Sequence, residues 1–344
     1  PVCRALGGDI RVAAVCDIVP ELADRFAAQV GARACYDYGA LLDSGIDAVV
    51  VASPLPLHAE QSIQALERGI HVLSEVTACH DLDSAAQLAR AAAASRAVYM
   101  FAENCCYYDE IELVKRMAAD GLFGEAIYGE GEYLHCCRSL LRDAAGALTW
   151  RGRGWPGIYC THSLGPLLEI LQDRVTRVTA LDTGSPAHWD REIPYPESTE
   201  FLAQTAAGRR LRIRVDYQSP HPYTLYFALQ GTGGAYESAR GLGDQAKVWL
   251  EADPTPGADR LHPEWRPLAD YAARYIPERL ALAGRQDLGP HQGSEYWLLK
   301  DFVAAVRGEI ASPIDCFRGL DYTVPGICAV MSAQRGGEPV DVPD

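Results

Sequence analysis

The chain has 344 residues, of which 48% are hydrophobic and 22% are charged, as in a globular protein with room for two domains. Its net charge of −15, from 31 basic and 46 acidic residues, argues against a nucleic-acid partner. No apolar run approaches the ~20 residues of a membrane-spanning helix, so we expect no membrane partner. The eleven cysteines are odd in number and contain no CxxC spacing, which favours free thiols in the cytoplasm over disulfides or a metal site.

The first hundred residues alternate between apolar strand patterns and amphipathic helix patterns. The predicted strands cover residues 10–16, 48–52, 71–76 and 97–102, and the predicted helices cover 20–30, 57–68 and 83–95. Strands without polar alternation, separated by helices, are typical of a parallel sheet covered on both faces. The sequence therefore predicts an α/β fold with a doubly wound parallel (Rossmann) sheet in a domain of residues 1–103.

A dinucleotide-binding domain normally starts with a strand, a GxGxxG turn and a helix. Only nine residues precede the first predicted strand, and Gly7-Gly8 follows the helix-like segment VCRAL instead of a strand. Two interpretations stay open: the natural chain extends upstream by about 20 residues, the length of that motif, or the phosphate-binding turn is missing. An export signal, and with it a periplasmic form, also stays open.

After residue 103 the pattern changes to consecutive strands. Helices are predicted at 109–120, 159–171, 294–307 and 317–333, and strands at 125–135, 175–182, 200–206, 210–218, 224–230, 235–238 and 247–251. Strands that follow one another without helices indicate an antiparallel or mixed open sheet. We expect residues 104–344 to form a second α/β domain with an open, mostly antiparallel sheet, its last helix packing back on the first domain.

Polar residues follow several predicted strands of the first domain, where open parallel sheets bind ligands. Asp17 ends the first strand, where a carboxylate accepts hydrogen bonds from NAD ribose, although Asp also serves as a helix N-cap. The turn Ser53 to His58 follows the next strand. It either binds a ligand or is only a loop stiffened by prolines. Glu75 ends the strand after that, on the same side of the sheet.

Four further residues carry groups suited to acid–base chemistry. Glu103 leaves the strand 97–102, where a structural cap is the alternative interpretation. Tyr159 and His162 are three residues apart in a predicted helix, which places phenol and imidazole on one face; a buried core histidine is the alternative. Tyr133 lies on the strand 125–135, and His135 faces the same side of that strand.

Taken together, several segments resemble the glucose–fructose oxidoreductase/inositol dehydrogenase (Gfo/Idh/MocA) family: VAAVCDIVPELADRFA, IDAVVVASPLPLHAEQSIQALERGIHVLSEV, GLFGEAIYGEG and DFVAAVRGEIASPID. The resemblance implies an NAD-binding Rossmann domain and a substrate-binding domain whose open sheet covers the active site and forms homo-oligomers. Dehydrogenases of this family carry Glu-Lys-Pro where this chain has Glu75-Val76-Thr77. The lysine that assists hydride transfer is therefore absent.

Another branch matches more closely. AENCCYYDEIELVKRMAADGLFGE, EGEYLH and IYCTHSLGP resemble glycoside hydrolase family 109, the NAD-dependent α-N-acetylgalactosaminidases, with Cys160 replacing the proline of a Tyr-Pro-Thr-His segment. The resemblance implies an NAD-dependent glycoside hydrolase that acts by transient oxidation at C3, elimination, water addition and re-reduction. The alternative is an NAD-dependent sugar or cyclitol dehydrogenase that keeps the oxidation, and a sensor without enzymatic activity is a third hypothesis.

Carried over to this sequence, the resemblance implies two sets of site residues. The catalytic set is Glu103, Tyr133, Tyr159 and His162. We expect His162 with Tyr159 at the hydroxyl that is oxidised, Tyr133 near C2 of the sugar, and Glu103 orienting nicotinamide or sugar. The residues expected to bind NAD are Asp17, Ser53, Pro54, Leu55, His58, Glu75 and Asn104.

Overall fold

The computed structural model describes residues 2–254 and 263–344, which fall into two compact units. Unit 1 comprises Pro1–Asn104 and Arg285–Leu320, and unit 2 comprises Cys105–Gly284 and Asp321–Asp344. Unit 1 thus regains a late segment that the linear division at residue 103 assigns to the second domain. Backbone pairing explains the return, because the Phe101 N–H donates to the Ile314 carbonyl at 2.8 Å.

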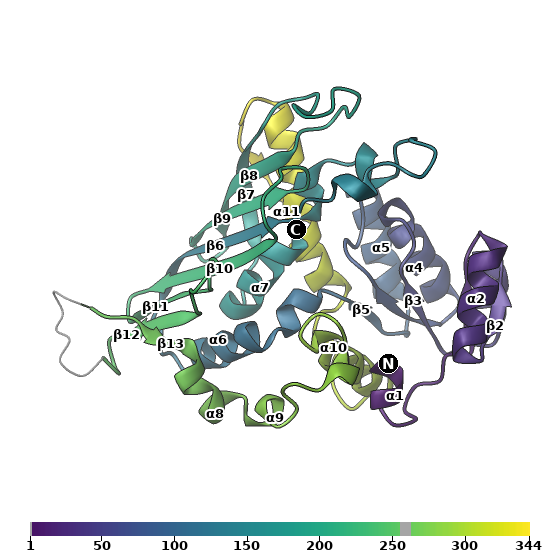
Figure 1. The fold of residues 1–344 in the computed structure, drawn as a ribbon, viewed down its shortest axis with the longest axis horizontal. Coiled ribbons are helices and arrows are strands. Elements are labelled where there is room, and N and C mark those ends of the chain that lie inside the picture. The colour runs from purple at the N-terminus through teal and green to yellow at the C-terminus, as the bar shows by residue number, and fades with distance from the viewer. Residues whose placement is uncertain (1, 255–262) are drawn as a thin grey trace. The chain divides into compact units, whose positions relative to one another are not determined.

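The strands of unit 1 form two parallel groups, β1-β2 and β3-β4-β5 (Figure 1). Their bounds are β1 Ala14–Cys16, β2 Arg33–Cys35, β3 Ala48–Val51, β4 His71–Ser74 and β5 Tyr99–Phe101. The predicted parallel α/β architecture is confirmed. The first strand is shorter than the predicted 10–16, and β1 is only half-buried, since β2 is its single neighbour among the described residues.

Helices follow the strands of unit 1 as expected for a doubly wound sheet. They are α1 Val2–Ala5, α2 Pro20–Val30, α3 Tyr38–Leu42, α4 His58–Glu67, α5 Leu82–Ala94 and, from the returning segment, α10 Ser294–Val306. Local sequence sets their ends: α2 has proline in its first turn and stops at Gly31 in the left-handed conformation. A capping box of Asp81 and Ser84 starts α5.

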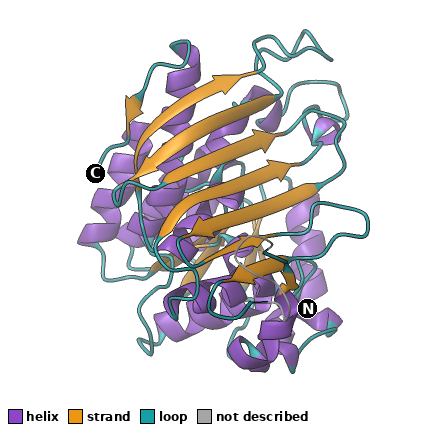
Figure 2. Ribbon diagram, turned by 90° about the vertical axis from the view of Figure 1, so that its left-hand side faces the viewer, coloured by secondary structure: helices purple, strands orange, loops and turns teal. Residues whose placement is uncertain are grey.

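Unit 2 is built on a nine-stranded sheet in the order β13-β12-β11-β10-β6-β9-β8-β7-β14. The long strands of this sheet lie side by side in Figure 2. Its strands are β6 Ala126–Leu134, β7 Val175–Asp182, β8 Ser198–Thr205, β9 Arg210–Asp216, β10 Thr224–Gly231, β11 Gly234–Glu237, β12 Lys247–Leu250, β13 Arg266–Pro267 and β14 Val340–Asp341. Only β6 and β9 pair in parallel; the other neighbours are antiparallel. The predicted open, mostly antiparallel sheet is therefore confirmed.

The helices described for unit 2 are α6 Asp109–Ala119, α7 Thr161–Leu171, α8 Ala272–Tyr275 and α9 Pro277–Leu280, with α11 Cys316–Gln334 beginning in unit 1. The apolar face of α7 packs on β6, and its Leu164, Leu167 and Leu168 are fully buried. On the opposite face of the sheet, alternate residues of β8 are exposed. In the parts of the chain that the structure describes, no helix combines the length and hydropathy needed to cross a bilayer.

Candidate active site

Tyr133 and His135 form the first contact of the site. Both side chains lie on the face of β6 that α7 covers, because residues two apart on a strand point the same way. The Tyr133 hydroxyl and His135 Nδ1 share a hydrogen bond of 2.7 Å. Burial, and then the nearby Arg151 and His162, lower the pKa of His135. Burial likewise raises the pKa of the Tyr133 phenol, so both groups are neutral near pH 7.

Tyr159 and His162 lie beside this pair, although they do not share one α-helix as predicted. Tyr159 ends a 3₁₀ turn, Pro156–Tyr159, and α7 begins only at Thr161. Their rings are nevertheless 5.1 Å apart, and the His162 ring lies 4.9 Å from that of Tyr133. The two residues stay adjacent because the turn leads directly into the helix.

Glycines on β6 allow this close arrangement. A Cβ atom at Gly131 would lie 2.0 Å from the Ser163 carbonyl oxygen, so only glycine lets α7 approach the strand this closely. Ser163 follows His162 directly in α7. The backbone contact therefore fixes the imidazole of His162 over β6, next to Tyr133.

Cysteines flank the histidine with different roles. The Cys105 sulfur lies 3.3 Å from His162 Nδ1, and Cys105 is buried. Cys160, which stands between Tyr159 and His162, is fully buried and donates from its thiol to the Tyr322 carbonyl at 3.3 Å. The thiol of Cys160 is therefore engaged with α11, as expected for a residue turned away from the cluster.

Two aromatic residues that the sequence did not predict complete the site. Tyr217, just after β9, has its ring 5.3 Å from Tyr159, and Tyr223, just before β10, has its ring 5.3 Å from His135. Strand register brings them here, because Tyr133 pairs with Val215 on β9 and with Leu225 on β10, two residues from each tyrosine. We call the set Tyr133, His135, Tyr159, His162, Tyr217 and Tyr223 the phenol–imidazole cluster.

The sequence also did not predict Arg151 as a residue of the site. It lies in the loop between β6 and α7, and its guanidinium carbon is 4.2 Å from the Trp150 ring centroid and 5.6 Å from that of Tyr159. Burial by itself would lower the pKa of Arg151. The nearby phenols of Tyr159 and Tyr217 more than offset this effect, so the pKa of Arg151 is raised. A cluster of phenols and imidazoles with a fixed cation can move protons and stabilise negative charge.

In unit 1, Asp17 follows β1 as predicted. It does not cap α2, whose N-cap position is Val19 without any side-chain bond. Instead, Asp17 Oδ1 accepts from the Val19 N–H at 2.8 Å, and the carboxylate is partly exposed. An oriented, partly exposed carboxylate after a parallel strand fits the recognition of ribose hydroxyls.

The predicted turn Ser53 to His58 is tightly bonded. A 3₁₀ turn spans Leu55–Leu57, and buried His58 places Nε2 2.7 Å from the Ser53 carbonyl and Nδ1 2.8 Å from that of Thr77. The imidazole thus ties the turn after β3 to the segment after β4. Glu75 follows β4 and is exposed. His58 accordingly positions the turn, and its neighbour Pro54 is exposed.

The structure brings three of the four predicted catalytic residues together in unit 2. Tyr133, Tyr159 and His162 are mutual neighbours. Glu103 and Asn104 close the first segment of unit 1, where Glu103 follows β5 and is fully buried. The place of Glu103 in the catalytic set stays a prediction.

Comparison with known families divides the chain close to Asn104, where the first segment of unit 1 ends. Residues 3–103 match the oxidoreductase family with an NAD-binding Rossmann fold, which identifies the nucleotide of this domain as NAD. Residues 107–344 match the C-terminal domain of glycosyl hydrolase 109.

Individual proteins agree with these matches. The chain is 30% identical to a glycosyl hydrolase family 109 protein of Saccharopolyspora erythraea, covering 100% of this chain and 79% of that protein. It is 25% identical to an alpha-N-acetylgalactosaminidase of Tannerella forsythia, over 87% and 71% of the two chains. The crystal structure of an oxidoreductase domain protein from Kribbella flavida superposes with a TM-score of 0.82 at 18% identity, covering 100% and 95% of the chains.

Proposed function

Because the chain belongs to glycosyl hydrolase family 109, we propose that it is an NAD-dependent glycoside hydrolase. The phenol–imidazole cluster carries the proposal, above all the 2.7 Å hydrogen bond between Tyr133 and His135 beside His162. Most glycosidases place two carboxylates on either side of the scissile bond, and the NAD-dependent ones are an exception. Phenols and imidazoles suit the exception, because its steps other than the hydride transfers are proton transfers at carbon and oxygen.

We assign the nucleotide to unit 1. When bound, NAD⁺ accepts a hydride from C3 of the sugar and returns it at the end of each cycle. The Asp17 carboxylate would hold the ribose hydroxyls, and its charge disfavours the additional phosphate of NADP. The remaining proposed contacts are Ser53, Pro54, Leu55, Glu75 and Asn104, with His58 holding the turn in place.

The sugar is assigned to the phenol–imidazole cluster of unit 2. His162, with Tyr159 beside it, takes the proton from the hydroxyl at C3. Tyr133 removes the proton from C2 while its own hydroxyl proton passes to Nδ1 of His135 through their hydrogen bond. Glu103 orients the sugar or the nicotinamide. Each assignment requires the group to reach its proton at about 3 Å.

Turnover without net redox change tests the proposal against the sugar or cyclitol dehydrogenase. A panel of aryl glycosides is incubated with the full chain and a catalytic amount of NAD⁺, and both aglycone release and NADH absorbance are followed. A hydrolase releases aglycone in many-fold excess over NAD⁺ without NADH accumulation, and in deuterated solvent it incorporates deuterium at C2. NADH formation equal to product identifies the dehydrogenase, and cleavage without exchange at C2 argues against elimination.

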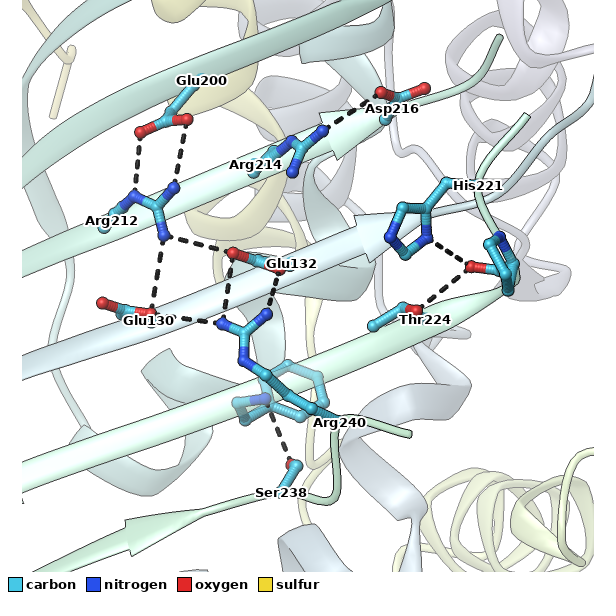
Figure 3. A network of polar contacts seen from close by, with 12 residues as sticks. Glu130, Glu132, Glu200, Arg212, Arg214, Asp216, His221, Thr224, Ser238 and Arg240 are labelled. Carbon is cyan, nitrogen blue, oxygen red and sulfur yellow. Dashed lines mark hydrogen bonds and ion pairs between the residues drawn. The ribbon is translucent and has the colours of Figure 1, made fainter. Parts of the chain in front are cut away.

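The open face of the unit 2 sheet is the proposed homo-oligomer interface. A network of ion pairs covers its centre, where Arg212 contacts Glu200 at 2.8 Å and Glu132 at 3.1 Å (Figure 3). Arg240 adds a second contact to Glu132 at 3.1 Å. Leu202 on β8 lies on this same face and is 58% exposed. A sheet face that combines satisfied charges with exposed leucine is suited to a second copy of the chain.

We place the protein in the cytoplasm. All eleven cysteines are free, including the sequence neighbours Cys105-Cys106 and Cys136-Cys137. Cysteines persist as thiols in reducing compartments, whereas oxidising ones favour disulfides. Localisation of the tagged natural gene product tests this assignment.

A further inference from the structure

Arg151 is a cation that the proposed proton transfers do not use. Among residues 2–254 and 263–344 no carboxylate forms an ion pair with it, although most arginines of unit 2 have acidic partners within 4.0 Å. Its side chain is partly buried, and its contacts are aromatic rings and the phenols of Tyr159 and Tyr217. A guanidinium that has no carboxylate partner in the described chain keeps its charge available for an anionic group of a ligand.

The backbone around Arg151 is rigidly built. A Cβ at the next residue, Gly152, would lie 2.3 Å from the Leu141 carbonyl oxygen, so the loop is packed against its own base. Leu141 is fully buried with Ala187 and Ile193 in a small core of this loop region. The Trp150 ring lies 4.2 Å from the guanidinium carbon, and the guanidinium donates toward the Tyr159 hydroxyl. Its remaining N–H groups are the donors with which arginine recognises oxyanions.

Tyr217 supplies an independent second observation. Its side chain is buried, with 4% of the residue exposed, and its hydroxyl has no hydrogen-bond partner among the described residues. Buried hydroxyls are almost always bonded, so an orphaned one indicates a missing ligand or water. Tyr217 contacts the same Tyr159 ring as Arg151, and it is close enough to Arg151 for electrostatic interaction.

We propose that Arg151 and Tyr217 form a subsite for a carboxylate on the sugar, so that the substrate is a uronic acid glycoside or a similar acidic sugar. This inference rests on the proposed carbohydrate site and specifies its substrate class. One guanidinium balances one negative charge, and its planar N–H edge matches the two oxygens of a carboxylate. A phosphate, with a charge of about −1.5 to −2, would leave an uncompensated charge in the site.

Equilibrium binding tests the subsite without requiring turnover. Calorimetry compares D-glucuronate with D-glucose, and D-galacturonate with D-galactose, on the NAD-loaded full chain. We expect at least one acid to bind about 10- to 100-fold more tightly than its neutral counterpart, the range for charge-assisted hydrogen bonds. Equal affinities within both pairs overturn the proposal.

Variants then assign the preference to its residues. Arg151→Gln is expected to abolish the preference for the acid, and Tyr217→Phe, which removes only the hydroxyl, to reduce it about 3- to 10-fold. Arg153→Gln is the matched control, because Arg153 lies two residues away and is exposed. A preference that survives in both Arg151→Gln and Tyr217→Phe contradicts the assignment. If the acids bind selectively but no glycoside is cleaved, the proposed function fails while the subsite stands.

Discussion

His135 shows how a single residue of the cluster acquires its chemistry. The ordinary histidine pKa is about 6.5, and burial together with Arg151 and His162 lowers it here. The imidazole is therefore neutral at physiological pH and shares a proton with Tyr133 through Nδ1. Position on the strand determines the partner, since the two side chains are two residues apart.

Lowering the pH should inactivate the enzyme through His135. We expect constant turnover near neutrality and a decline only at a pH below the ordinary histidine value of about 6.5, because the pKa of His135 is lowered and a protonated Nδ1 no longer accepts the Tyr133 proton. The unfolding free energy should fall in the same direction, since the unfolded chain binds the proton at a higher pH than the folded one. pH–rate profiles of wild type and His135→Asn check this. An acid limb that persists unchanged in the variant would assign it to another group.

Replacing His162 should remove catalysis without unfolding the chain. His162→Ala is expected to lower turnover on the order of 10²-fold or more, the effect of losing a general acid–base group. NAD affinity should stay nearly constant, because the nucleotide is assigned to unit 1. Steady-state kinetics and NAD titration measure the two effects. The control is Cys160→Ala, which should affect turnover little because the Cys160 thiol donates to the Tyr322 carbonyl. Full activity in His162→Ala would remove His162 from the catalytic set.

At the scale of secondary structure, the glycines of β6 decide where α7 lies. The segment GEGEY alternates glycine toward the helix with glutamate toward the open face, so one strand serves two surfaces. Because helix and strand approach closely, the ring centroid of His162 in α7 lies 4.9 Å from that of Tyr133 in β6. The site is a consequence of this packing.

A methyl group at Gly131 should therefore displace the helix. Its Cβ would meet the Ser163 carbonyl oxygen at 2.0 Å, so Gly131→Ala is expected to destabilise the protein by about 1–3 kcal/mol, as overpacking does. Turnover should fall as well, because His162 moves with α7. Chemical denaturation and kinetics measure both. Gly241→Ala is the control, since no atom lies within 4 Å of its Cβ position; equal stability of both variants would contradict the packing argument.

At the scale of the whole molecule, each unit has its own task in the proposed function. Unit 1 contains the parallel strands that match an NAD-binding fold, and unit 2 contains the cluster and the open sheet. The returning segment Arg285–Leu320 belongs to unit 1 and shows that the units are not simple halves of the sequence. The exposed sheet face remains as the surface on which copies of the chain would associate.

A charge on that face should dissociate the proposed oligomer. Leu202→Glu adds a carboxylate beside Arg212, its cross-strand neighbour, which Glu130, Glu132 and Glu200 already surround, so burial against a second copy would enclose an excess of negative charge. We expect sedimentation velocity to shift from an oligomer to a monomer. Leu280→Glu is the matched control, because Leu280 on α9 is also exposed, at 45%. A wild-type chain that sediments as a monomer would refute the proposed interface.

Local sequence patterns were enough to predict most of the helices and strands. Strand β7 occupies the predicted residues 175–182, and the helix of residues 109–120 is present as α6, because periodicity and turn residues act locally. Asp17, the turn at Ser53 and the neighbours Tyr159 and His162 were predicted as site residues for the same reason, since each lies at an element boundary. Their roles stay predictions.

The surroundings of these residues depend on contacts between distant parts of the chain. Arg151 and Tyr217 reach Tyr159 from a loop and from the end of β9, and no local pattern specifies that meeting. The division of the two parallel groups in unit 1, and the return of residues 285–320, likewise depend on pairings between distant segments. Strand register and long-range packing arise from contacts across the chain, which is why local sequence patterns do not reveal them.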